Sequence, residues 1–513
     1  MATYANHVLK KARRIMIKTP YQDLEARFRR MDAVGGALSM LHWDMSAMMP
    51  PGGVDSRTEQ LAVLKTIHHG MITDPALPDL LDGAEADQHL DTWQQANIAE
   101  MRRKWVHSAA VETDLVEAIS RASAKCETVW REARANADFK SVLPYLEEVL
   151  NLSRQEAQAK SEKLGVSPYD ALLDQYEPDG RAEDIDVVFA DLGSFLPDFL
   201  DDVLCQQASG PAILPLQGPF PAAKQKALGQ TFMAALGFDF DHGRLDESHH
   251  PFCGGTYDDV RLTTRYDEAD FTSALMGVLH ETGHAMYDQG LPKAWRGQPV
   301  GGDRGMSIHE SQSLLVEMQA CRSHEFLEYA APLLRETFGG QGPAWEVDNL
   351  TRLYTHVQKG FIRVDADEVT YPAHVILRFQ LERAAIKGDL QMADLPMAWN
   401  EGLHRILGIT PPSDREGCLQ DIHWYDGAWG YFPTYTLGAM TAAQFFAKAK
   451  ADKPEILPAI AHGDFAPLMG WLRDNVHAKG CSLSPRTLVT QATGEPLNAE
   501  HFKAHLKTRY LNH

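Results

Sequence analysis

Residues 271–291, with the sequence FTSALMGVLHETGHAMYDQGL, decide how this chain folds around its most distinctive side chains. A largely apolar stripe recurs there at the spacing of one helix face: Phe271, Ala274, Leu275, Val278, Leu279 and Thr282. The spacing predicts a helix that Asp270 can cap at its start and that Gly290-Leu291-Pro292 ends. His280 and His284 then lie one turn apart on the same face, beside the buried stripe.

The segment His280-Glu281-Thr282-Gly283-His284 has the H-E-x-x-H pattern of a metal-binding helix. Two imidazoles one turn apart can bind one Zn²⁺, and Glu281 beside them can polarise a water molecule. The alternative is a helix with two unrelated histidines and a surface glutamate. The apolar stripe next to the imidazoles favours the metal site.

A catalytic zinc ion needs a third protein ligand and an open coordination position. A metzincin would have a histidine six residues after His284, but this chain has Gly290 there, so that class is excluded. We therefore expect a carboxylate from a second helix, and Glu310 is the candidate. Ser307-x-x-Glu310 also matches a capping box, a purely structural role that the positions alone do not separate from ligation. Two aspartates compete as ligands: Asp288 and Asp303.

The rest of the chain is dominated by helical periodicity. The clearest helical segments are residues 21–40, 92–135, 139–164 and 184–204. Polar and apolar side chains alternate over residues 259–265, which follow the turn-forming Gly254-Gly255. This segment is the best strand candidate. Residues 408–435 are rich in Gly, Pro, Trp and Tyr and predict a long binding loop. No repeat or long linker divides the 513 residues, so we expect one continuous unit.

Composition limits the partners. The formal net charge of −21 argues against nucleic acid and against an anionic membrane surface. No run of about 18 apolar residues predicts a membrane span. The basic N-terminus (Lys10, Lys11, Arg13, Arg14 and Lys18) lacks the apolar core of a secretory signal. The six cysteines are scattered singly, which is typical of free thiols in a reducing compartment, so we expect a cytoplasmic protein.

Five patterns in order, the H-E-x-x-H motif among them, resemble the carboxypeptidase Taq family of metallocarboxypeptidases. They are D-x-R-x-T at Asp259-Val260-Arg261-Leu262-Thr263, H-E-x-x-H at 280–284, H-E-S-Q at His309-Glu310-Ser311-Gln312, I-R-x-x-A-D at Ile362-Arg363-Val364-Asp365-Ala366-Asp367, and G-x-x-Q-D-x-H-W at 417–424. Looser similarity covers Leu41-His42-Trp43-Asp44 and residues 169–178. Asp179-Gly180 departs mildly from the family pattern, far in sequence from the metal motifs.

The resemblance implies a mainly α fold, a zincin whose third ligand is Glu310, with a small β-sheet beside a deep active-site groove. We expect one peptidase domain over residues 1–513, with a helical N-terminal part at about 1–210 and the metal-site part at 211–513. The family resemblance also implies a homodimer that removes single C-terminal residues from peptides with broad specificity. Zn²⁺ is the expected metal, although Co²⁺ would suit the same ligands.

Several residues are assigned roles on this basis. Glu281 is the expected general base, and His423 and Tyr435 resemble the His and Tyr pair of related zincins that stabilises the oxyanion, with Tyr431 as the alternative tyrosine. Arg363 is expected to bind the substrate's terminal carboxylate, unless it forms a structural ion pair with Asp367.

Two further residues, Arg261 and Gln420, are candidates for substrate binding. Arg261 could instead pair with Asp259 or Asp421 as part of the scaffold, and residues 259–265 could add a strand to the substrate. The runner-up function is an oligopeptidase or dipeptidase with the same zinc site. A non-enzymatic scaffold is disfavoured, because it would have no need of Glu281.

Overall fold

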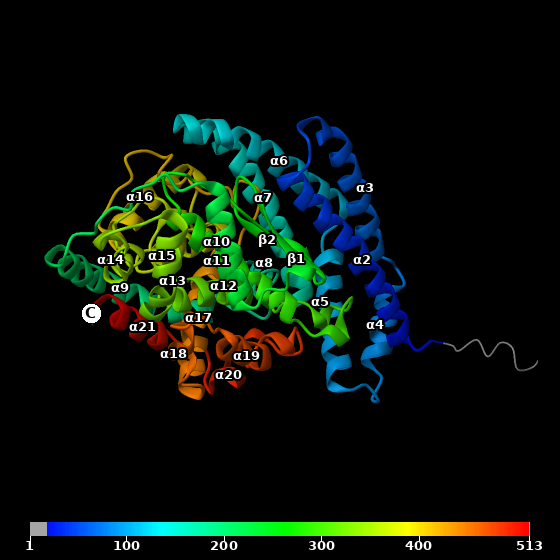
Figure 1. The fold of residues 1–513 in the computed structure, drawn as a ribbon. Helices are drawn as coiled ribbons and strands as arrows, with labels where there is room; N and C mark the ends of the chain where they lie inside the picture. The colour runs from blue at the N-terminus through cyan, green and yellow to red at the C-terminus, as the bar shows by residue number, and fades with distance from the viewer. Residues whose placement is uncertain (1–17, 512–513) are drawn as a thin grey trace, which may run out of the picture.

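The computed structural model describes residues 18–511. The basic residues Lys10, Lys11, Arg13 and Arg14 considered above lie outside the described residues. Helices dominate, and a single small sheet lies among them (Figure 1), so the predicted mainly α fold with a small β-sheet is confirmed.

The first part of the chain contributes long helices. They are α2 (Pro20–Ala47), α3 (Val54–Ile72), α4 (Leu77–Glu85), α5 (Thr92–Ala109), α6 (Thr113–Asn136), α7 (Phe139–Leu164), α8 (Pro168–Leu173) and α9 (Ala182–Ser209). Helices α2, α3 and α4 pack together along one side of the molecule (Figure 1). The predicted helix at 92–135 is two helices, because the chain turns at residues 110–112 and α6 then packs against α7.

The remaining helices surround the metal motifs. They are α10 (Ala222–Leu236), α11 (Thr272–Gly290), α12 (Met306–Leu314), α13 (His324–Phe338), α14 (Val347–Tyr354), α15 (Tyr371–Lys387), α16 (Leu395–Leu407), α17 (Pro433–Asp452), α18 (Ile456–Ile460), α19 (Ala466–Asn475), α20 (Pro485–Thr493) and α21 (Glu500–Leu511). A π-helical turn, Leu315–Ala320, continues α12. Helix α11 ends at Gly290 as predicted, and the carboxylate of Asp270 accepts the backbone N–H of Thr272 at its start.

The sheet has three strands in the order β1-β3-β2: β1 (Gly243–Glu247), β2 (Phe252–Thr256) and β3 (Asp259–Thr264). Strand β3 pairs with β1 in parallel and with β2 in antiparallel orientation. The predicted strand at 259–265 is therefore real, but the idea that it adds a strand to the substrate is wrong, because both of its edges are already paired. Strands β1 and β2 are the two edge strands of the sheet.

Residues 18–511 form two large apolar cores and a smaller one. Helices α10 to α14 and the sheet share one core, which holds Leu275, Leu279 and Ile308. Helices α7, α9, α15 and α16 share the other, which holds Trp424 and Phe432 from the 408–435 loop. The metal helices are thus supported by one core and the loop by the other. Within residues 18–511, no helix is both long enough and apolar enough to cross a membrane.

Candidate metal centre

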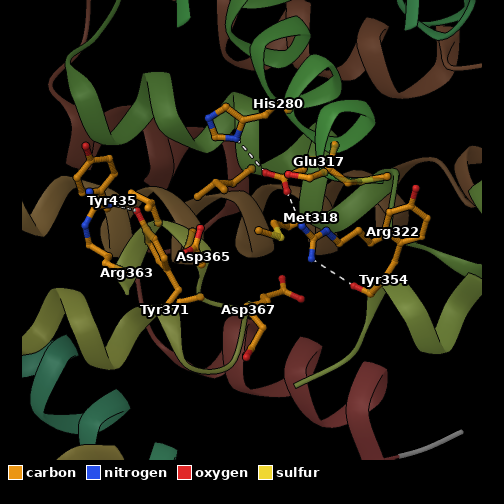
Figure 2. Close-up of a pocket in the computed structure, with 18 of the residues that line it drawn as sticks. His280, Glu317, Met318, Arg322, Tyr354, Arg363, Asp365, Asp367, Tyr371 and Tyr435 are labelled. Carbon is orange, nitrogen blue, oxygen red and sulfur yellow. Dashed lines mark hydrogen bonds and ion pairs between the residues drawn. The ribbon is translucent and has the colours of Figure 1, made fainter. Parts of the chain in front are cut away.

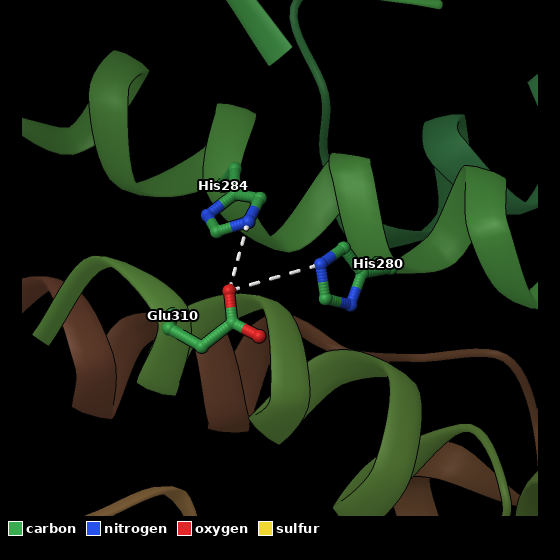
Figure 3. Close-up of side chains that lie close together, drawn as sticks. All are labelled: His280, His284 and Glu310. Carbon is green, nitrogen blue, oxygen red and sulfur yellow. Dashed lines mark ion pairs between the residues drawn. The ribbon is translucent and has the colours of Figure 1, made fainter. Parts of the chain in front are cut away.

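His280, His284 and Glu310 converge in the structure (Figure 3). The Oε2 atom of Glu310 lies 3.9 Å from Nε2 of His280 and 3.5 Å from Nε2 of His284. One ligand atom from each residue lies within 4.8 Å of the other two. Two imidazole nitrogens and one carboxylate oxygen form the donor set of a catalytic zinc site, so these residues fit the metal.

Close helix packing brings the three residues together. Helix α11 carries the histidines and α12 carries Glu310, and the two helices touch at Gly283. A Cβ at residue 283 would lie 2.6 Å from the Cα of Ser313, so only glycine permits this approach. Helix α17 also packs closely against α12, since a Cβ at Gly438 would lie 2.8 Å from the Cβ of Glu310.

The capping-box interpretation of Glu310 is wrong. Helix α12 begins at Met306, its N-cap is Gly305 with φ +90°, and no side chain caps it. Ser307 therefore lies inside the helix, and the carboxylate of Glu310 faces the imidazoles instead.

The competing ligands are not part of the cluster. Asp288 accepts a hydrogen bond from Nε2 of His309 at 3.2 Å. Asp303 lines a second cavity, next to Cys481 and Tyr257, rather than the cavity that holds Glu310.

Partners behind the ligands orient both imidazoles. Nδ1 of His280 lies 3.0 Å from Oε2 of Glu317, whose Oε1 accepts from Arg322 at 2.6 Å. Nδ1 of His284 lies 2.6 Å from Nδ1 of His309. Such contacts leave the Nε2 atoms free for a metal. No motif in the sequence indicates these contacts, although Glu317 follows Glu310 by seven residues, about two helical turns.

Electrostatics separate the two glutamates of the site. Burial by itself would raise the pKa of the Glu310 carboxyl, but the facing imidazoles of His280 and His284 lower it to about 2. Burial raises the pKa of Glu281 to about 7, and its side chain is only 7% exposed. Glu310 is thus suited to bind a cation, and Glu281 to exchange a proton.

A cavity of about 730 Å³ opens onto these residues. Its walls include His280, Glu281 and Glu310 together with Arg363 and Tyr435. Figure 2 shows Arg363 and Tyr435 on one side of this cavity and Arg322 on the other. Its size suits a small ligand such as the end of a peptide.

Arg363 is buried and does not pair with Asp367. Its Nε and Nη2 donate to Oδ1 of Asp421 at 3.1 and 2.8 Å, and its Nη1 donates to the Tyr371 hydroxyl at 3.1 Å. Asp367 instead accepts backbone N–H groups of Gln358, Val369 and Thr370. The predicted alternative ion pair of Arg363 with Asp367 is therefore wrong.

Asp421 also pairs with Arg378, whose Nε lies 2.7 Å from Oδ2. Burial opposes the charged carboxylate, but the two guanidinium groups hold the pKa of Asp421 far below its usual range. The single negative charge of Asp421 thus faces the positive charges of two arginines, Arg363 and Arg378. The surplus positive charge lies at the cavity wall that Arg363 forms.

His423 and Tyr435 lie together, with Nε2 of His423 3.3 Å from the Tyr435 hydroxyl. Tyr435 lines the cavity. Burial lowers the pKa of His423 to about 4, which keeps its ring neutral near pH 7. The ring of Tyr431 is 5.2 Å from that of Tyr435, and its hydroxyl points to the sulfur of Met306 at 3.9 Å.

Gln420 and Arg261 make contacts within the scaffold. Oε1 of Gln420 accepts the backbone N–H of Arg363 at 2.8 Å, and its Nε2 donates to backbone carbonyls, including that of Glu416 at 2.8 Å. Arg261 makes two hydrogen bonds to Asp259 at 2.8 and 2.7 Å and lies over the ring of Trp43. Neither residue lines the cavity that contains Glu281.

The chain is similar to known proteins over nearly its whole length. The family model described as carboxypeptidase Taq (M32) metallopeptidase matches residues 23–510. Thermostable carboxypeptidase 1 of Thermus thermophilus is 38% identical over 502 residues, which cover 96% of this chain and 98% of that protein. Carboxypeptidase 1 of Bacillus subtilis is 36% identical over 491 residues, covering 94% of this chain and 96% of that protein.

Solved structures show the same architecture. Metallocarboxypeptidase 1 of Trypanosoma cruzi has a TM-score of 0.94 at 41% identity, over 96% of this chain and 99% of that one. An M32 carboxypeptidase from Deinococcus radiodurans R1 has a TM-score of 0.91 at 36% identity, over the same shares of the two chains.

Proposed function

The chain belongs to the carboxypeptidase Taq (M32) family and is a metallocarboxypeptidase, and we propose that His280, His284 and Glu310 hold a zinc ion beside Glu281 as general base. The observation that carries the proposal is the presence of Glu281, Glu310 and Arg363 in the walls of one cavity. Zinc bound there would act as a Lewis acid that polarises the scissile carbonyl and acidifies water.

Glu281 performs the proton transfers. Its carboxylate takes a proton from the attacking water and returns it to the leaving amine. Burial supports this role, since it raises the pKa of Glu281 to about 7, close to the value that favours transfer in both directions near neutral pH.

Tyr435 supplies a hydrogen bond to the carbonyl oxygen as negative charge develops there. His423 lies 3.3 Å from the Tyr435 hydroxyl and orients it. Tyr435 is preferred over Tyr431 because Tyr435 lines the cavity, whereas the Tyr431 hydroxyl points to Met306.

We expect Tyr435→Phe to lower kcat by about 10²-fold or more, since the variant lacks this donor. Tyr431→Phe, which removes a hydroxyl next to the same loop, is the matched control and should cause a smaller loss. Steady-state kinetics on one N-blocked peptide measure both. The opposite ranking would transfer the role to Tyr431.

Arg363 binds the terminal carboxylate of the substrate. Asp421 and Tyr371 hold its guanidinium, and the two remaining N–H groups are free to bind a carboxylate. Recognition of a chain end distinguishes a carboxypeptidase from an oligopeptidase.

The test compares an N-blocked peptide with its C-terminally amidated form. We expect the wild type to release the single C-terminal residue of the free acid and to cleave the amide poorly. Arg363→Ala should lower kcat/KM for the free acid by about 100-fold and cost the amide far less. Arg378 still pairs with Asp421 in this variant, so the fold and the zinc content should be retained. Equal cleavage of acid and amide by the wild type would contradict the anchor and the exopeptidase assignment.

We also propose a location, an oligomeric state and a specificity for the enzyme. The protein acts in the cytoplasm as a homodimer and as one peptidase domain, on short peptides with broad C-terminal specificity. The imidazole and carboxylate ligands also suit Co²⁺. Elemental analysis of the purified protein identifies the metal, and light scattering gives the oligomeric state.

A further inference from the structure

The cavity beside the metal site is rich in acidic groups. Its walls contain six carboxylates: Glu281, Glu310, Glu317, Asp365, Asp367 and Glu368. Glu281 and Glu310 belong to the metal site, and Glu317 binds both His280 and Arg322. These three therefore have defined roles near the reacting bond.

Two more of the six carboxylates already accept hydrogen bonds from other groups of the protein. Asp367 accepts three backbone N–H groups, which shape the loop before α15. Oε1 of Glu368 accepts from His505 at 2.8 Å and from Gln319 at 3.2 Å, and Oε2 accepts from Arg509 and Tyr510. Neither carboxylate is free to meet a ligand.

Asp365 is more exposed than the other five carboxylates. Within residues 18–511, its carboxylate makes no hydrogen bond or ion pair, and the residue is exposed. It ends the 3₁₀ turn Arg363–Asp365, two residues after the arginine assigned to the substrate carboxylate. Figure 2 shows Asp365 in the wall between Arg363 and Arg322.

The positive groups of this cavity do not neutralise Asp365. Arg322 donates to Glu317 at 2.6 Å and to the Tyr354 carbonyl at 3.2 Å, so its charge is already paired. Arg363 is held by Asp421 and, in the proposed function, binds the substrate's carboxylate. The space between the two arginines therefore faces an unpaired negative charge.

Apolar side chains also line this cavity. Met276 and Met318 line the same cavity, and Met276 is only 4% exposed. Flexible thioether side chains pack well against a long aliphatic chain. A lysine or arginine side chain has such a chain and a cationic end that needs an acidic partner.

We propose that Asp365 is a specificity-determining residue that favours basic over acidic C-terminal residues of the substrate. The inference rests on the proposed function, because it requires that Arg363 hold the C-terminal carboxylate in this cavity. The side chain of the C-terminal residue then lies along the methionines, and its charged end meets Asp365.

The experiment uses three N-blocked peptides that differ only in a C-terminal Lys, Gln or Glu. For the wild type we expect kcat/KM to fall in that order. Asp365→Asn should reduce the Lys-to-Glu ratio by about tenfold, mainly through KM, and leave the Gln peptide nearly unchanged. Asp365→Lys should reverse the preference toward Glu. The Gln peptide and the zinc content together report whether each variant is intact.

Glu401→Gln is the matched control, since Glu401 is an exposed acid on α16 that lines neither large cavity. It should leave the ratio at the wild-type value. A ratio that stays unchanged in Asp365→Asn and Asp365→Lys, with activity on the Gln peptide retained, would overturn this inference alone. If the wild type released no C-terminal residue from any of the three peptides, the proposed function itself would fail.

Discussion

Glu281→Gln should abolish turnover and leave the metal bound. Glutamine has nearly the same shape as glutamate but cannot accept the proton of the attacking water, so we expect kcat to fall by about 10³-fold or more. Glu281 is not one of the three residues that converge as ligands. Elemental analysis should therefore find as much zinc in the variant as in the wild type.

The matched control is Glu325→Gln, a partly exposed acid in the first turn of α13. It should retain both activity and metal. Loss of zinc from Glu281→Gln would show that Glu281 acts as a ligand, and full activity in the presence of zinc would show that another group is the base.

Glu310→Ala should lose both metal and activity. The carboxylate of Glu310 lies between the two imidazoles, and the pKa of about 2 means that it stays charged throughout the working range of a peptidase. Without it, two imidazoles remain, which is one protein ligand fewer than a catalytic zinc site needs. Elemental analysis after gel filtration should find little or no zinc.

The zinc content distinguishes this result from a structural one. Loss of a helix cap would cost about 0.5–2 kcal/mol of stability and leave the metal content unchanged. Glu310→Ala removes the contacts to His280 and His284 but no capping contact, so we expect the zinc to be lost whatever the change in melting temperature. Asp303→Ala is the control and should keep its zinc. A Glu310→Ala protein with full zinc content would contradict the ligand assignment.

The local parts of the site could be predicted from sequence. The i, i+4 spacing of His280 and His284 puts both imidazoles on one helix face regardless of the rest of the fold, because helix geometry is set by neighbouring residues. The apolar stripe from Phe271 to Thr282 predicted that this helix packs into a core, and the structure places it there. Helix α7 runs over residues 139–164 as its periodicity predicts.

The resemblance to the carboxypeptidase Taq family predicted features that local sequence patterns do not determine. The ordered motifs indicated the family, the mainly helical fold and the carboxypeptidase activity, and these are confirmed. The choice of Glu310 over Asp288 and Asp303 also came from the resemblance. Spacing alone left that choice open, because a carboxylate on another helix can reach the metal only if the two helices pack closely.

Tertiary structure decided the long-range pairings. Arg363 pairs with Asp421, 58 residues away, rather than with nearby Asp367, because the loop that carries Asp421 folds against the start of α15. Strand β3 is central and not at the edge, since β1 and β2 take both of its sides. The periodicity of a strand reports which face is buried, but not which neighbours it has.

Packing also determined which residues support the metal site. Gly283 matters because α12 lies directly against it, and Glu317 reaches His280 from a π-helical turn that no pattern in the sequence signals. The sequence by itself thus determined the elements with local periodicity and the residue types of the site. The partner of each charged group was decided by the tertiary structure, because a buried charge binds whichever opposite group packing brings within reach.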